Sequence, residues 1–204
     1  MWVLWILHKV HSGKRFKIIK TILLFLLLAT TIIHAKIIAQ IPEASGICFI
    51  PQTKNLIVVN DEGYIYKLDT KGKILKSRYL GKYNFEGVAY LPDKDKLLVA
   101  VEDENSVYVV SRKKFKILKK IEIKKKFEKT KILRKITQHG YRNGLEAIAV
   151  CNNTVVLSNQ SFIPWPEDKG SVVFTINSVK KKKAKITEVF NHGYIDISGL
   201  CFHD

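Results

Sequence analysis

A short pattern of polar and apolar positions occurs four times along this chain. Each copy places Ser or Glu before Gly or Ala, and alternating apolar residues follow. The copies are Ala44–Phe49, Phe85–Tyr90, Leu145–Val150 and Ile197–Phe202. Their starts lie 41, 60 and 52 residues apart. A period of roughly 40 to 60 residues built from short strands is typical of a β-propeller.

The segments after the first two copies support a repeat of several strands. Asn55–Asn60 and Lys96–Val101 are rich in β-branched and aliphatic residues, and each ends in an acidic turn. Turn-forming Pro, Asp, Asn and Gly residues separate these runs. No apolar periodicity of 3.6 residues is found after residue 40. The sequence therefore predicts an all-β protein, a β-propeller of four-stranded antiparallel blades.

The N-terminal region has a different character. Lys14–Lys20 is basic, Thr21–Ile33 is uncharged and mostly apolar, and Ala35 could end a cleavage site. This order matches an export signal, and the apolar run is short for a membrane span. We interpret residues 1–35 as a hydrophobic helix that is a signal peptide or an N-terminal membrane anchor, with a buried helix of the domain as the alternative. Residues 36–204 are the propeller domain.

Lysine dominates the composition, and the formal net charge is +17. Two stretches carry much of it, Arg112–Lys135 and Lys180–Lys185. In residues 115–123 the lysines alternate with Ile, Leu and Phe, which predicts the solvated face of outer strands. Association with an anionic membrane or with envelope polymers is the alternative. Export argues against a nucleic-acid partner.

The cysteines and histidines show no metal-binding or redox spacing. Cys48, Cys151 and Cys201 are three and lack a CxxC motif, so we expect buried free thiols, with a disulfide as the alternative. His139 and His192 each precede a glycine shortly before a repeat copy. That placement indicates a recurring loop between blades.

The acidic and hydroxyl positions carry the most informative chemistry. In a propeller, residues at one repeat position converge on the central axis. Here that position holds Ser45, Glu86, Glu146 and Ser198. Two carboxylates and two hydroxyls suit a hard cation such as calcium. Alternatively, these side chains accept hydrogen bonds from the backbone amides of a neighbouring blade.

A second acidic position follows the second strand of the first two repeats, at Asp61, Glu62 and Glu102. These residues could add metal ligands or simply form turns. No Ser-His-Asp spacing, no phosphate-binding glycine loop and no HExxH motif is found, so no catalytic residue is assigned.

Five motifs in register resemble the SdiA-regulated (YjiK-like) family. They are Pro42–Ile47, Val59–Tyr66, Phe85–Tyr90, Asn143–Ala149 and Asp196–Leu200. The resemblance implies a five-bladed, NHL-related β-propeller with a calcium site at the bacterial cell envelope. It makes Glu86 and Glu146 the foremost site residues, followed by Asp61, Glu62 and Glu102.

The chain also departs from the family pattern. Ala147 replaces the usual Gly, and Asn159 and Gln160 stand where an acid is expected. The chain reaches only one strand into its fourth unit, so we expect about three blades plus one strand of a C-terminally truncated propeller.

Two function classes follow from this reading. The first is an envelope propeller, periplasmic or on the periplasmic face of the inner membrane, that binds calcium and a protein or polymer partner. The second is a metal-dependent hydrolase similar to lactonase or phytase-type propellers.

Overall fold

The computed structural model describes residues 37–124, 126–127, 130–132, 144–160, 171–194 and 197–202. The chain divides into two compact units, residues 1–37 and 38–204. The hydrophobic helix predicted within residues 1–35 lies outside the described residues. Within the described ranges, no helix is long and apolar enough to cross a membrane.

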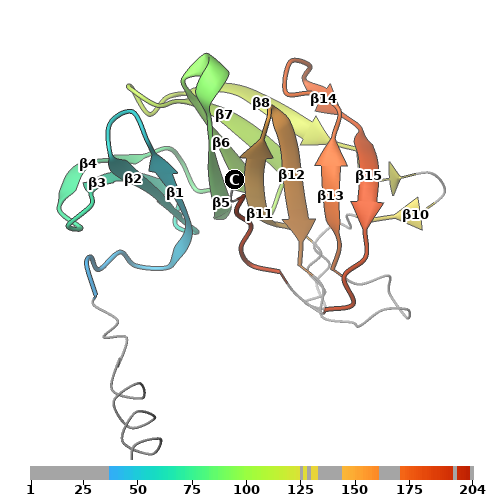
Figure 1. Ribbon diagram of the computed structural model, residues 1–204, viewed down its shortest axis with the longest axis horizontal. Helices are drawn as coiled ribbons and strands as arrows, with labels where there is room; N and C mark the ends of the chain where they lie inside the picture. The colour runs from blue at the N-terminus through green and yellow to red at the C-terminus, as the bar shows by residue number, and fades with distance from the viewer. Residues whose placement is uncertain are drawn as a thin grey trace, which may run out of the picture. The chain divides into compact units, whose positions relative to one another are not determined.

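Three antiparallel sheets follow one another along the second unit, each formed by four strands whose neighbours in the sheet are hydrogen-bonded (Figure 1). Sheet 1 comprises β1 (Ala44–Ile50), β2 (Asn55–Asn60), β3 (Tyr64–Asp69) and β4 (Ile74–Tyr79). Sheet 2 comprises β5 (Phe85–Leu91), β6 (Lys96–Val101), β7 (Ser106–Ser111) and β8 (Ile117–Ile123). Sheet 3 comprises β11 (Leu145–Cys151), β12 (Thr154–Asn159), β13 (Val173–Ile176) and β15 (Ile186–Phe190).

Smaller elements extend these sheets. The strand β14 (Lys183–Ala184) pairs in parallel with β8 and so joins sheet 2. The strands β9 (Lys126–Phe127) and β10 (Thr130–Lys131) form a separate pair. A single 3-10 turn, η1 (Pro92–Lys94), connects β5 to β6. The described regular structure is otherwise all β, as the sequence predicts.

The alternation along β6 explains how sheet 2 packs on both neighbours. Leu97, Val99 and Val101 belong to a core cluster shared with sheet 1. Leu98 and Ala100 belong to a second cluster shared with sheet 3. Successive side chains of a strand point to opposite faces, so one continuous apolar run supplies two cores. All five side chains are fully buried.

The first strands of the sheets approach one another closely at two glycines. A Cβ atom on Gly46 would lie 2.7 Å from the carbonyl oxygen of Glu86, and one on Gly87 would lie 2.9 Å from the amide nitrogen of Ile148. Both neighbours are main-chain atoms, which cannot move aside as a side chain can. The glycine of the repeated pattern therefore lets β1, β5 and β11 pack main chain against main chain.

The fourth copy of the pattern docks on sheet 3 without forming a strand in its described residues. Ser158 Oγ accepts a hydrogen bond from the amide of Ala147 at 3.1 Å and donates one to the carbonyl of Ile197 at 2.8 Å. A buried hydroxyl on β12 thus connects the third and fourth copies.

Candidate functional site

An irregularity of strand pairing recurs at the same place in each sheet. The register between the first and second strands shifts between Ala44 and Gly46, between Phe85 and Gly87, and between Leu145 and Ile148. A β-bulge leaves a residue out of the ladder and re-aims its side chain. The residues within these intervals include Ser45, Glu86 and Glu146, which are three of the four repeat positions singled out by sequence.

The four copies of the pattern line one hollow of about 310 Å³. The polar residues Ser45, Glu86 and Ser198 line it together with the small residues Ala147 and Gly199. The hollow is therefore the place where segments more than 150 residues apart in sequence meet.

Negative charge gathers around Glu86. Burial raises the pKa of the Glu86 carboxyl to about 7, and the nearby charges of Glu102, Asp61 and Asp103 add to this increase. A hydrogen bond from Ser45 acts in the opposite direction. Like charges disfavour ionisation because the carboxylates repel one another at short range. The structure thus brings Glu86 near Glu102 and Asp61, which directly follow the second strands of two different sheets.

The second acidic position has a structural counterpart in the third sheet. The backbone N–H groups of Asp61, Glu102 and Gln160 each donate to a carbonyl just ahead of the first strand of their own sheet. The acceptors are Glu43, Asn84 and Gly144, at 3.3, 3.0 and 2.9 Å. Gln160 is therefore equivalent to Asp61 and Glu102. This agrees with the repeat pattern of the sequence, in which Asn159 and Gln160 stand where an acid is expected.

Glu102 is the most enclosed acid of this group, with 2% of its surface exposed. Its Oε2 accepts a hydrogen bond from Asn84 Nδ2. Gly144 lies against its side chain, since a Cβ atom at Gly144 would lie 2.1 Å from Glu102 Cγ. Glu102 thus connects the segment before β5 with the residue before β11. Neither Asn84 nor Gly144 was singled out from the sequence, because their roles arise only from pairing between elements.

The other two predicted acids have different surroundings. Glu62 accepts a hydrogen bond from Asn60 Nδ2 at 3.4 Å, and its charge helps to raise the pKa of Tyr66. Its side chain therefore acts within sheet 1. Glu146 is buried on β11, and its main chain packs against Gly87.

The oxygen-bearing side chains around Glu86 are of the types that bind a hard cation. Among the described residues, no three His, Cys, Asp or Glu side chains are placed so that they could hold a metal ion. Asp61 Oδ1 and Asn84 Oδ1 are buried, and within the described part of the chain no group donates a hydrogen bond to either oxygen. Calcium accepts carboxylate, amide and backbone carbonyl oxygens in flexible geometry, so the residue types fit this ion.

The cysteines are free thiols, but they are less buried than the sequence suggested. Cys48 and Cys151 are half-buried, and Cys201 is exposed. The expectation of three buried thiols is therefore wrong for Cys201, whose segment lies on sheet 3 without being covered. Burial raises the pKa of the Cys48 thiol to about 12, which keeps it protonated.

The histidine expectation can be followed only for His192, because His139 lies outside the described residues. The His192 ring stacks on Tyr194, and its Nδ1 accepts a hydrogen bond from the Tyr194 amide at 3.0 Å. Gly193 between them has a φ of 77°. These contacts are those of a tight loop, in agreement with the loop role predicted for this position.

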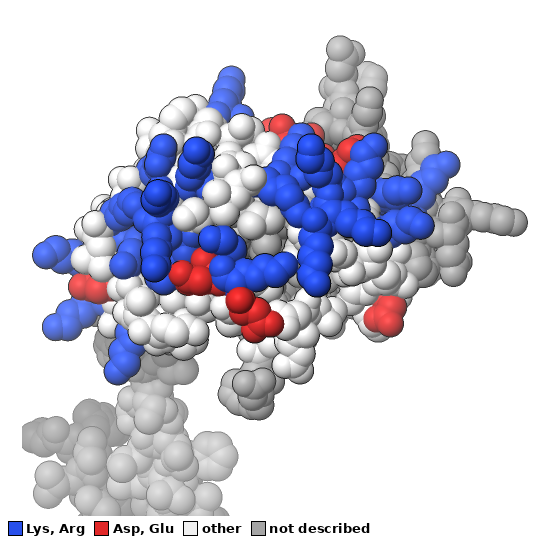
Figure 2. Space-filling model, turned by 90° about the horizontal axis from the view of Figure 1, so that it is seen from above, with Lys and Arg blue, Asp and Glu red and all other residues white. Residues whose placement is uncertain are grey.

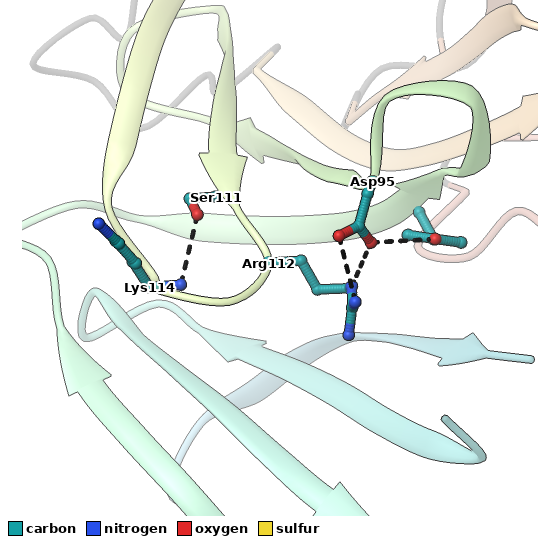
Figure 3. A network of polar contacts seen from close by, with 5 residues as sticks. Asp95, Ser111, Arg112 and Lys114 are labelled. Atoms are coloured by element: carbon teal, nitrogen blue, oxygen red, sulfur yellow. Dashed lines mark hydrogen bonds and ion pairs between the residues drawn. The ribbon is translucent and has the colours of Figure 1, made fainter. Parts of the chain in front are cut away.

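A separate polar network holds the η1 turn in place. Arg112 forms an ion pair with Asp95, whose carboxylate also accepts a hydrogen bond from Tyr90 at 3.2 Å (Figure 3). Asp95 ends η1 in the left-handed conformation, with a φ of 48°. This network joins the β5–β6 turn to the end of β7, and we assign it a structural role.

Comparison with protein families gave a match that covers most of the chain. The model of the SdiA-regulated family matches residues 28–198. This range contains all three sheets and the residues around Glu86. No curated protein matches the chain.

Proposed function

This chain belongs to the SdiA-regulated family, and we propose on that basis that its three sheets are blades of a β-propeller at the bacterial cell envelope. Consecutive four-stranded sheets support this, as does the packing of β1, β5 and β11 against one another. Residues 1–35 serve in this proposal as signal peptide or membrane anchor and place residues 36–204 outside the cytoplasm. N-terminal sequencing of the mature protein distinguishes cleavage from anchoring.

We propose that the acidic surroundings of Glu86 bind calcium. The observation that carries this proposal is the gathering of carboxylates around Glu86: burial raises the pKa of its carboxyl to about 7, and the nearby charges of Glu102 and Asp61 add to that increase. Carboxylates that repel one another are stabilised when a cation lies between them. Glu86, Glu102 and Asp61 are the side chains that would hold the ion, with Asn84 as a further oxygen donor and Glu146 as the neighbouring repeat position. Ser45 and Ser198 complete the polar wall of the hollow.

The function we infer is binding rather than catalysis. Glu86 lines the hollow where all four copies of the pattern meet, so a calcium ion held by Glu86, Glu102 and Asp61 would link sheets 1 and 2 beside that hollow. It would also present a face to a protein or polymer partner. A bound ion stabilises the folded state in proportion to its affinity, because the unfolded chain does not bind it.

Calcium titration of the full-length protein tests this proposal. We expect about one ion per chain by calorimetry, and a rise in melting temperature that a chelator reverses. In Glu86→Gln the affinity should fall at least tenfold, because one of the converging charges is lost. Glu62→Gln is the matched control, since Glu62 pairs with Asn60 within sheet 1, and it should bind as the wild type does. Equal effects of the two substitutions, or no calcium binding by a folded wild type, would refute the site.

A metal-dependent hydrolase is the second candidate, and one observation favours it. A carboxyl whose pKa is about 7 can act as a general base near neutral pH. Simple lactones and phosphate monoesters, assayed with added calcium, test this alternative. Turnover that is lost in Glu86→Gln but kept in Glu62→Gln would establish it.

A further inference from the structure

A band of basic side chains crosses from sheet 1 to sheet 2. Lys76 Nζ, on β4, donates a hydrogen bond to the carbonyl of Lys113 at 2.8 Å. Arg78, on the same strand, donates to the carbonyl of Lys114 at 3.0 Å. The two acceptors lie in the turn between β7 and β8. Two cations of one sheet are thereby held beside two exposed cations of the next.

The band continues from sheet 2 to sheet 3. Lys119, on β8, donates hydrogen bonds to the carbonyls of Val179 and Lys180, both at 2.7 Å. The segment that contains Lys180 also supplies β14, which pairs with the edge of β8. We call Lys76, Arg78, Lys113, Lys114, Lys119 and Lys180 the basic band.

Three side chains of the basic band, Lys76, Arg78 and Lys119, donate hydrogen bonds to backbone carbonyls. The ion pairs found among the described side chains are Arg112–Asp95, Lys120–Glu104 and Lys183–Glu122, none of which involves a band residue. Figure 2 shows the resulting surface from above, where Lys and Arg greatly outnumber Asp and Glu. Such a concentration of unneutralised charge costs self-repulsion, which a bound anionic partner would relieve.

A hollow with an apolar floor lies in the band where sheets 2 and 3 meet. Lys94, Lys96, Lys119 and Lys180 line it together with four aliphatic side chains. One of these is Leu118, which is 50% exposed. The hollow therefore combines cationic groups with accessible apolar surface, and none of the described residues that line it is acidic.

We propose that the basic band docks the domain on an anionic phospholipid bilayer. The phosphate groups of the lipid headgroups would attract the lysine ammonium groups, and the acyl region would contact the apolar side chains of the hollow, including Leu118. A soluble polyanion would interact with the lysine charges alone and would leave the apolar side chains of the hollow uncovered. The connection from the apolar sequence Thr21–Ile33 to β1 at Ala44 is also short, about 35 Å when fully extended. A chain anchored there would keep the domain close to the membrane.

The test uses full-length protein and vesicle co-sedimentation. Two triple variants remove the same charge from exposed lysines. The band variant carries Lys113→Gln, Lys114→Gln and Lys180→Gln, which leave the accepting carbonyls in place. The control variant carries Lys54→Gln, Lys71→Gln and Lys82→Gln in turns outside the band. Each is measured with phosphatidylcholine vesicles and with vesicles that also contain phosphatidylglycerol, and unchanged melting temperatures show that both fold.

We expect the band variant to lose roughly 100-fold in affinity for the anionic vesicles, the order expected for three lysines at a charged bilayer. Binding to neutral vesicles should not change, because the N-terminal segment contributes to it equally in the wild type and in both variants. Equal losses of affinity in the two variants would mean that net charge alone explains the binding to anionic vesicles, and this would overturn the proposal. Band-dependent binding to soluble polyphosphate without binding to anionic vesicles would assign the surface to a soluble polyanion instead. Calcium affinity at Glu86 should be the same in both variants, so this test is independent of the calcium proposal.

Discussion

Gly87 packs directly on the main chain of Glu146, since a Cβ atom at Gly87 would lie 3.0 Å from the Glu146 carbonyl oxygen and 2.9 Å from the Ile148 amide nitrogen. Gly87→Ala should therefore push β5 and β11 apart. Overpacking of this kind costs about 1–3 kcal/mol, measurable by urea unfolding. Gly199→Ala is the matched control from the same repeat position, because no atom of the described residues lies within 4 Å of its Cβ site. Equal destabilisation by both changes would contradict the close packing of the first strands.

The pH dependence of stability should report on Glu86. Its pKa rises on folding from 4.5 to about 7, so the folded state disfavours the charged carboxylate. The stability that Glu86 contributes is fully present below pH 4.5 and is lost as the pH rises through about 7. Because the carboxyl is partly exposed to solvent, the loss should be on the order of 1–2 kcal/mol. Unfolding of wild type and Glu86→Gln at pH 5 and pH 8, with a chelator present, should show the decrease in the wild type alone.

The hydroxyl of Ser158 should stabilise the fold through its two hydrogen bonds. Ser158→Ala leaves the Ala147 amide and the Ile197 carbonyl without this partner, which costs about 1–3 kcal/mol for buried groups. Ser77→Ala on the exposed strand β4 should change the free energy of unfolding by less than about 0.5 kcal/mol. Hydrogen exchange of the Ala147 amide provides a local measurement, and unchanged protection in Ser158→Ala would argue against the contact.

The Arg112–Asp95 pair should stabilise the η1 turn modestly. Arg112 lowers the pKa of the Asp95 carboxyl, so the stabilisation is present above the ordinary aspartate pKa and is lost as the pH falls through the lowered value. The Asp95 side chain is partly exposed to solvent, and we expect Asp95→Asn to cost no more than about 1 kcal/mol at neutral pH. The difference between the two proteins should disappear in strong acid. A difference that persists there would mean that Asp95 acts through its backbone conformation alone.

Much of the strand order could be predicted because the relevant physics is local. Alternating apolar residues and turn-forming Pro, Asp and Gly positions mark the first and second strands of the first two sheets, and the structure has those strands. Prediction was weaker for Leu145–Phe202, where β13 follows a stretch outside the described residues and the fourth copy forms no strand in its described part. The described part of that copy is held by a hydrogen bond from the Ser158 hydroxyl on β12 rather than by strand pairing.

The candidate site was predictable in its residue types but not in its pairing. Repetition identified Ser45, Glu86 and Glu146 as equivalent, and the structure places all three at strand irregularities. The repeated pattern could not show that Glu62 accepts a hydrogen bond from Asn60, or that Glu102 is buried between Asn84 and Gly144. Those contacts join residues whose separation in space is set by the folded sheets.

The sequence by itself determined the all-β fold, the recurring first strand and the family, because strand periodicity, turn residues and repeated motifs are properties of short segments. Only the tertiary structure decided which acidic side chains lie close enough to interact and which cationic side chains lie on one surface. Charges interact over a few ångströms in space, whatever their separation in the chain. Asp61 and Glu86 are brought together by the packing of β1 against β5, and Lys119 and Lys180 by the arrangement of sheets 2 and 3.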